Sequence, residues 1–378
     1  MERITRSESR IAGVGQRSSC AALHAMPRSL TAYGPSAPTL REFPQRPLSE
    51  PYPRVSTHHT TAKELWHCLR AAAKTLSVKI LRRLLTILLS TCIIRALKQK
   101  SDAIAGDMNV EHVRANGILM RCQIDGPANG RPLLLCNGLA TDMSMWDRQV
   151  SEFAADYRVI RYDLRGHGET SATVPPYSLS LLVEDLRSFL DALGLEQVHF
   201  VGMSLGGMVG QSFAARYPNR LLSLVLCDTT AKANREIWEG RIQQVRLEGV
   251  RPMVEPSLER WFTEPFRQAN APLIDEVREM IKGTAVEGYL GGAGVVMEQD
   301  QVRQLHRISA PTLIIVGRED VSTPPADAEV LHKHITGSTL HVVDNAAHLP
   351  NIEQPEVFNK LLKEFLTRLD GVAAESRQ

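Results

Sequence analysis

One strand-to-helix junction in the middle of the chain most restricts the folds open to it. The apolar run VHFVGMS, which spans Val198 to Ser204, continues directly into the helical pattern LGGMVGQSF. A short apolar run that is rich in β-branched residues is typical of a strand buried on both faces. Strands of this kind, when they alternate with helices, form an open and mostly parallel sheet with helices on both sides.

Similar apolar runs and helical patterns alternate over residues 108–370. The segments predicted to be buried strands are Pro132–Leu139, Tyr157–Asp163, Val198–Ser204, Leu221–Asp228, Thr312–Gly317 and Ser338–Asn345. Before them, the dipeptide Asn116-Gly117 joins two alternating segments and predicts a β-hairpin. In such a sheet we expect the ligand site beyond the C-terminal ends of the strands.

Residues 231–308 interrupt the alternation. They are dense in helix formers and contain two tryptophans, Trp238 and Trp261. Helices inserted before the last strands predict a cap over the strand ends, where a substrate pocket needs a lid. The core is then expected to consist of residues 108–230 and 309–370, with a tail over residues 371–378.

The first 107 residues differ from the rest in charge. The formal net charge of the 378-residue chain is +2, but residues 1–107 contain 17 basic and 7 acidic residues, and the remainder contains 27 and 35. Residues 1–60 are rich in Ser, Pro, Arg and Thr, a composition that predicts disorder. Residues 61–100 are predicted to form one amphipathic helix. Their longest uncharged apolar run is much shorter than the ~20 residues that a membrane-spanning helix needs.

Three interpretations compete for the helix of this basic extension. A signal peptide is disfavoured because the apolar run lies too far from the N-terminus. An interfacial helix or an organelle transit segment remains open, so any membrane contact is expected only through this extension. The favoured interpretation is that the extension takes no part in the chemistry and that the working protein begins at Met108.

The six cysteines are scattered, without CxxC spacing or a His/Cys cluster. This pattern does not indicate a zinc ribbon or a redox pair. A reducing, cytoplasmic location is therefore expected.

The strand-to-helix junction carries the motif G-x-S-x-G, from Gly202 to Gly206, with Ser204 at its centre. A serine on this tight turn is held in a strained backbone conformation, and the flanking glycines leave room for it. The strand before the motif and the helix after it support a nucleophile. The alternative is a serine that caps a helix in an ordinary turn.

A nucleophilic serine needs a base and an acid, which follow it in the chain in this architecture. His348 follows the last predicted strand, and we expect it to be the base. Asp320 follows the strand before it, and we prefer it as the acid over its neighbour Glu319. His167 precedes the serine in the chain, whereas the base follows the serine in this architecture. We therefore interpret His167 as a residue that fixes its own loop.

An acyl-transfer site also needs two backbone N–H donors for the oxyanion. The residue after the nucleophile, Leu205, is predicted to supply one donor. The loop after the first central strand is predicted to supply the other through Leu139.

These segments carry a family resemblance. From about Met108 to Leu369 the chain resembles an α/β-hydrolase and, more narrowly, the 3-oxoadipate enol-lactonases. The segments that carry the resemblance are CNGLATDMSMWDRQV, YRVIRYDLRGHGETS, VHFVGMSLGGMVGQSFAARYPNRLLSLVLCDTTA, ERWFTEPF and NAAHLPNIEQPEVFN. The oxyanion loop departs from the family pattern at Gly138 and Ala140.

The resemblance implies hydrolysis of an enol-lactone to 3-oxoadipate through Ser204, His348 and Asp320, with no metal or cofactor. A substrate with a free carboxylate also needs a polar partner in the cap. The candidates are Trp238, Arg241, Arg260 and Trp261. The arginines could equally lie on a solvated helix face instead of binding substrate. The tryptophans could equally serve only to pack the cap.

Two other functions stay open on the sequence. A carboxylesterase for other small esters would use the same three residues with a differently lined cap. A noncatalytic binding protein could share the fold, although an intact serine, acid and histidine argue against it. A small-molecule ester or lactone is the expected partner, and nucleic acid is not expected because residues after 107 are net acidic.

Overall fold

The structure is a computed structural model that describes residues 109–375. The predicted disordered extension and its amphipathic helix lie outside the described residues, as do residues 376–378. The predicted boundary of the C-terminal tail at residue 371 is wrong, because the last helix continues to Glu375. Within the described part, no helix is both long enough and apolar enough to cross a membrane.

Eight strands of the described chain form one sheet in the order β1-β2-β4-β3-β5-β6-β7-β8. Their bounds are β1 Asn109–Ala115, β2 Ile118–Asp125, β3 Arg131–Cys136, β4 Tyr157–Tyr162, β5 Val198–Met203, β6 Leu221–Cys227, β7 Thr312–Gly317 and β8 Thr339–Val343. Strand β2 is antiparallel to both of its neighbours, and the pairs from β4 to β8 are parallel. The predicted fold class, a mostly parallel sheet flanked by helices, is confirmed.

The turn between β1 and β2 follows from its two residues. Asn116 and Gly117 both have positive φ, 43° and 77°, and they bring Ala115 opposite Ile118. A two-residue hairpin turn needs this left-handed backbone, which Asn and Gly adopt at low cost.

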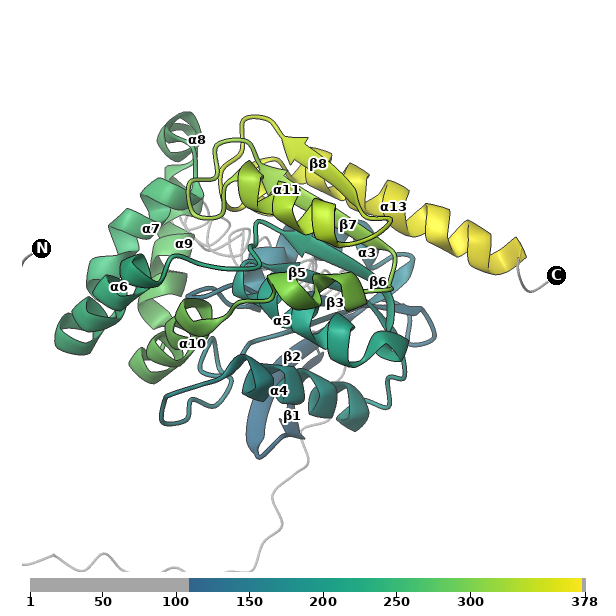
Figure 1. Cartoon of the computed structure of the whole chain (residues 1–378), viewed down its shortest axis with the longest axis horizontal. Helices are drawn as coiled ribbons and strands as arrows, with labels where there is room; N and C mark the ends of the chain where they lie inside the picture. The colour runs from purple at the N-terminus through teal and green to yellow at the C-terminus, as the bar shows by residue number, and fades with distance from the viewer. Residues whose placement is uncertain (1–108, 376–378) are drawn as a thin grey trace, which may run out of the picture. The chain divides into compact units, whose positions relative to one another are not determined.

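Helices cover both faces of the sheet (Figure 1). Those in front of it in this view are α4 Leu179–Ala192, α5 Leu205–Arg216 and α11 Pro325–His334. Those behind it are α3 Asp147–Phe153 and α13 Pro355–Glu375. Because every residue of β5 and β7 is buried, side chains on both faces of these strands need an apolar cover, which the two helical layers supply.

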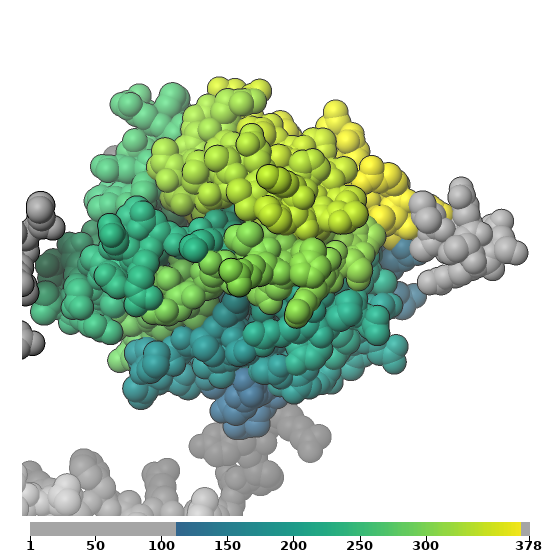
Figure 2. All heavy atoms as spheres, in the orientation of Figure 1, coloured from purple at the N-terminus to yellow at the C-terminus, as the bar shows by residue number. Residues whose placement is uncertain are grey.

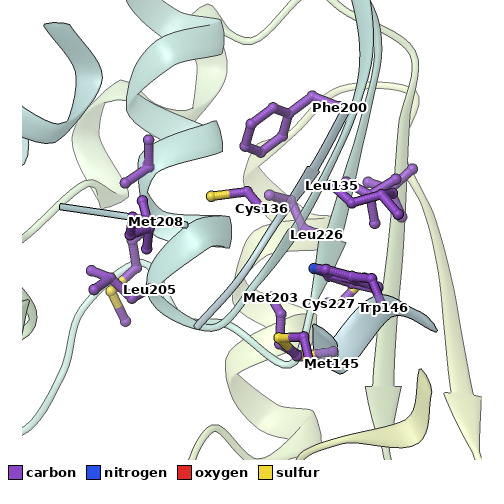
Figure 3. Packing of buried hydrophobic residues seen from close by; sticks show 14 of the residues in the cluster. Leu135, Cys136, Met145, Trp146, Phe200, Met203, Leu205, Met208, Leu226 and Cys227 are labelled. Carbon is purple, nitrogen blue, oxygen red and sulfur yellow. The ribbon is translucent and has the colours of Figure 1, made fainter. Parts of the chain in front are cut away.

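The central helix α5 packs closely on the sheet. Figure 3 shows Phe200 and Cys136 on the side of the strands that faces this helix, and Leu135 and Trp146 on the other side. A Cβ atom at Gly210 would lie 2.6 Å from the ring of Phe200, so only glycine allows this approach.

The segment between β6 and β7 is mostly helical. Its helices are α6 Arg235–Glu248, α7 Val254–Trp261, α8 Glu264–Ala269, α9 Ala271–Gly283 and α10 Val286–Glu298. They gather at one end of the sheet, as Figure 1 shows, and the space-filling view of Figure 2 places their atoms beside the core on the same side. We call these five helices the cap.

The chain order around β3 determines where a ligand can bind. The chain passes from β3 outward to β4 and then returns to the other side of β3 as β5. A reversal of this kind leaves a crevice beyond the C-terminal ends of the two inner strands. The loop after β3 and the serine after β5 therefore lie at the same edge of the sheet.

Acid should destabilise the fold through His199, a buried residue of β5 that bonds Ser223 Oγ. Burial, and then the charge of Arg131, lower the pKa of His199 from 6.5 to about 4. The unfolded chain takes up a proton first, so this stability is complete above pH 6.5 and declines as the pH falls to about 4. Between about pH 7.5 and about pH 5 the loss is about 2 kcal/mol.

Urea unfolding at the two pH values measures this contribution. His199→Gln should remove it from the free energy of unfolding, whereas His341→Gln, at an exposed histidine, should not. An unchanged pH dependence in His199→Gln would contradict the assignment.

Two helix glycines should respond oppositely to an added methyl group. Gly210→Ala forces the Phe200 ring aside and should lower the free energy of unfolding by about 1–2 kcal/mol. Gly240 lies inside α6 with nothing within 4 Å of an added Cβ, so Gly240→Ala should raise it by about 0.5–1 kcal/mol. Urea unfolding of both variants tests the difference. Equal effects would show that an added methyl group fits between α5 and the ring of Phe200.

Candidate active site

Ser204 lies on a strained turn between β5 and α5. Its φ is 52° and its ψ is −112°, a left-handed backbone that a non-glycine residue rarely adopts. Two contacts hold it there: its N–H donates to the carbonyl of Cys227 at 2.9 Å, and its carbonyl accepts from Thr229 Oγ1 at 2.7 Å. A strained backbone of this kind persists only where the surrounding structure fixes the residue, as in nucleophile turns.

The two motif glycines allow the turn to pack. A Cβ at Gly202 would lie 2.5 Å from the carbonyl oxygen of Gly206, and one at Gly206 would lie 2.6 Å from that of Asn137. Both approaches are shorter than any real Cβ contact, so the G-x-S-x-G spacing is a packing requirement of the close approach of β5, α5 and the loop after β3.

Asp320 and His348 form a buried hydrogen-bonded pair. His348 Nδ1 lies 2.8 Å from Asp320 Oδ2. The other carboxylate oxygen accepts from the backbone N–H groups of Ser322 and Thr323, at 2.7 and 3.2 Å. Burial opposes ionisation of Asp320, but the imidazole and the donors from Thr323 outweigh it and hold its pKa below the ordinary value.

Glu319, the alternative acid, turns away from the imidazole. Its Oε2 accepts from the backbone N–H of Ala346 at 3.0 Å. The structure thus brings Asp320, and not Glu319, to His348. Sequence reasoning missed Thr323, whose Oγ1 donates to Asp320 Oδ2 at 2.7 Å and lies 3.3 Å from His348 Nδ1.

The loop after β3 is held by its own polar side chains. Asn137 Nδ2 donates to the carbonyls of Gly138 and Thr141, and Asn137 Oδ1 accepts from the N–H of Leu164. Ala140 has a φ of 60°, which bends the chain back over the strand end. This loop presents Leu139 at the edge where the serine lies.

The backbone N–H groups of Leu139 and Leu205 have no hydrogen-bond acceptor in the described part of the chain. Leu205 begins α5, so its amide also lies at the positive end of the helix dipole. Two free amides beside a serine suit the binding of a negatively charged oxygen.

A cavity of about 360 Å³ lies between the strand ends and the cap. The predicted site residues that line it are Leu139, Ser204, Trp238, Arg241, Arg260, Trp261 and His348. Leu205 and Asp320 lie outside the lining, behind Ser204 and His348. A cavity of this size suits a small molecule.

Two arginines enter this cavity from the cap without a carboxylate partner in the described chain. Arg241 lies with its guanidinium carbon 4.6 Å from the centre of the Trp238 ring. Arg260 donates to Ser257 Oγ, and its Nε is buried without a partner. Burial, and then the charge of Arg241, lower the pKa of Arg260 to about 10. Two desolvated cations side by side favour an anion between or beside them.

Apolar and aromatic groups complete the cavity. Trp261 is mostly buried, and its ring centre lies 6.3 Å from that of His348. Tyr289 lines the same cavity and was not among the predicted site residues.

His167 lies apart from this lining. Its Nδ1 contacts the carbonyl of Arg165 in the same loop at 3.0 Å, and burial lowers its pKa to about 4. The contact is of the kind expected for a residue that fixes its own loop.

A buried carboxylate joins the cap to the loop that carries the imidazole. Glu353 Oε1 accepts from the N–H of Thr263 in the cap, and its Oε2 accepts from the N–H of Ala347, each at 2.9 Å. The residue after Ala347 is His348. Burial raises the pKa of Glu353.

One group of three possible metal ligands occurs in the described residues: Asp228, Asp320 and His348, with ligand atoms within 4.8 Å of one another. The direct hydrogen bond between His348 and Asp320 occupies the atoms that a metal ion would need. We therefore interpret Asp320 and His348 as a hydrogen-bonded pair with Asp228 beside it.

Comparisons with known proteins agree with this geometry. The family described as alpha/beta hydrolase fold matches residues 131–355. Two curated relatives from Acinetobacter baylyi, 3-oxoadipate enol-lactonase 2 and 3-oxoadipate enol-lactonase 1, are 36% and 34% identical to this chain. The alignments cover 65% and 66% of this chain and 92% and 94% of the relatives.

Solved structures give the same result. The enol-lactonase from Burkholderia xenovorans LB400 has a TM-score of 0.67 and 32% identity, over 68% of this chain and all of that one. A thermophilic esterase from Thermogutta terrifontis with malate bound has a TM-score of 0.64 and 32% identity, over 69% of this chain and 97% of that one. The predicted resemblance is confirmed: the chain belongs to the α/β-hydrolase family and is similar to the 3-oxoadipate enol-lactonases.

Proposed function

We propose that the protein is a serine hydrolase of carboxylic esters in which Ser204, His348 and Asp320 act as a catalytic triad. The observation that carries the proposal is the hydrogen-bonded pair of His348 and Asp320 at a cavity that also holds Ser204 on its strained turn. Hydrolase activity is also what the family and the relatives support.

The first half of the reaction forms an acyl-enzyme. Because Nδ1 of His348 is bonded to Asp320, its Nε2 is the nitrogen free to take the proton of Ser204. Ser204 Oγ then bonds to the substrate carbonyl carbon, and the negative oxygen is held by the amides of Leu139 and Leu205. Collapse of this intermediate breaks the ester C–O bond as His348 returns the proton to the leaving oxygen.

The second half releases the acid. His348 takes a proton from water, the hydroxide bonds to the acyl carbon, and collapse returns the proton to Ser204. Asp320 stays ionised throughout and stabilises the imidazolium, which suits its lowered pKa.

For the substrate we propose 3-oxoadipate enol-lactone or a similar small lactone. Ring opening by Ser204 would leave the new enol on the acyl chain, and water would release 3-oxoadipate. The names of the relatives, the small cavity and the two unpaired arginines, Arg241 and Arg260, support an anionic substrate of this kind. Its carboxylate would bind at the arginines while the lactone carbonyl lies at Ser204.

A carboxylesterase for other small esters is the second candidate. It is favoured by the similarity to the Thermogutta terrifontis esterase, which is as identical to this chain as the Burkholderia enol-lactonase is. A noncatalytic binding protein is the remoter alternative, but it would not explain the strained backbone of Ser204. We also propose a small molecule as the partner, with no nucleic acid.

Hydrolysis rates of triad variants test the reaction. Ser204→Ala should lower kcat on p-nitrophenyl acetate at least about 1,000-fold, and Asp320→Asn about 100-fold or more. Glu319→Gln is the matched control, because its side chain can still accept from Ala346, and it should stay within about threefold of the native rate. A native rate in Ser204→Ala would overturn the serine hydrolase, and a larger loss in Glu319→Gln than in Asp320→Asn would reverse the choice of acid.

Cap arginine variants test the substrate class. Arg241→Met and Arg260→Met should each raise KM for 3-oxoadipate enol-lactone about 10- to 100-fold, because a charge-assisted hydrogen bond is lost. The same variants should hardly change KM for p-nitrophenyl acetate, which has no carboxylate. Arg246→Met, at an exposed arginine of α6, is the control. Equal losses on both substrates, or a native enzyme no faster on the lactone than on the ester, would contradict the lactonase proposal.

A further inference from the structure

A second buried carboxyl group lies beside the proposed triad. Asp228 follows β6 directly, is 1% exposed, and has a positive φ of 41°. Its N–H donates to the carbonyl of Ile315, and its Oδ1 accepts from the N–H of Gly317 at 2.8 Å. These bonds to Ile315 and Gly317, near the C-terminal end of β7, fix Asp228 at the strand edge where the triad residues lie.

The remaining oxygen of Asp228 faces acidic surroundings. Oδ2 is buried and receives no hydrogen bond from any described residue. The neighbouring titratable groups are Asp320 and His348, which lie within 4.8 Å, Glu353 at longer range, and the adjacent thiol of Cys227. No described lysine or arginine forms an ion pair with Asp228, so the two aspartates meet without a cation between them.

Ionising both of two neighbouring buried carboxyl groups is costly, which favours a proton on one of them. Asp320 accepts hydrogen bonds from Ser322 and Thr323 and contacts His348, all of which favour its charged form. Asp228 has one backbone donor. Burial, and then the charge of Asp320, raise the pKa of Asp228 well above its ordinary value, which favours the protonated form of Asp228.

We propose that Asp228 is a positioning residue, a neutral carboxylic acid whose Oδ2–H donates a hydrogen bond to the carboxylate of Asp320 and holds it toward His348. The proposal rests on the triad function proposed above. It accounts for the otherwise unpartnered Oδ2, since a protonated oxygen needs an acceptor and the facing carboxylate supplies one.

A neutral donor suits this place better than a cation would. It fixes the orientation of Asp320 without cancelling the charge that stabilises the imidazolium of His348. Without it, Asp320 keeps the bond to His348 and the donors of its own loop, from Ser322 and Thr323.

Steady-state kinetics of three variants at Asp228 test the proposal on p-nitrophenyl acetate with the full chain. Asp228→Asn retains an N–H donor toward Asp320 and an oxygen for the N–H of Gly317, so it should rescue function to within about threefold of the native kcat. Asp228→Ala lacks the donor and should lower kcat about 10- to 30-fold with KM nearly unchanged. Asp228→Leu, which fills the volume, should behave like Asp228→Ala and replaces it if that variant does not fold.

A double-mutant cycle separates positioning from mere structural support. If Asp228 acts through Asp320, then Asp228→Ala should cost less than about threefold in kcat when made in the Asp320→Asn background. The same 10- to 30-fold loss in both backgrounds would overturn the proposal, as would a native kcat in Asp228→Ala or equal losses in Asp228→Asn and Asp228→Ala.

Ser204→Ala, measured alongside, keeps the two proposals distinguishable. If Ser204→Ala hydrolyses the ester at the native rate, the serine hydrolase itself fails, whatever the aspartate variants do. If Ser204→Ala is inactive and Asp228→Asn is as slow as Asp228→Ala, the triad stands and only the role of Asp228 is wrong.

Discussion

The convergence of parallel strand ends is the constraint on which the rest of this structure depends. Strands β3, β5, β6, β7 and β8 run in the same direction, so the residues after each of them emerge at one edge of the sheet. Leu139, Ser204, Asp228, Asp320 and His348 each follow a different strand, yet they surround one small region. No single segment of the chain contains the site, because the sheet assembles it.

This constraint explains how much of the site could be predicted from the sequence. A residue that follows a buried strand is recognisable without coordinates, and Ser204, Asp320 and His348 were chosen on that ground. The fold class followed from the same strands. Thr323 and Asp228 were missed because their contacts depend on side-chain directions across neighbouring loops, and Asp228 also follows a strand that the expected chain order of the triad leaves unused.

The cap residues, in contrast, could not be identified from their positions in the sequence. Arg241 and Arg260 were candidates only through the resemblance, since an arginine on a predicted helix most often faces water. What distinguishes them is the way two helices bring them together over the same cavity without a carboxylate, a fact of tertiary packing. Two desolvated cations favour a nearby anion, a feature that composition does not reveal, since the residues after 107 are net acidic.

The carboxylate of Glu353 connects the cap to the loop that carries His348. One of its oxygens holds Thr263 in the cap, and the other holds Ala347, the neighbour of His348. Displacing the cap at this end must therefore break the bonds that also steady the imidazole. The position of the cap and the orientation of the imidazole are therefore coupled through one side chain, and a displacement of the cap that leaves both bonds of Glu353 intact leaves His348 in place.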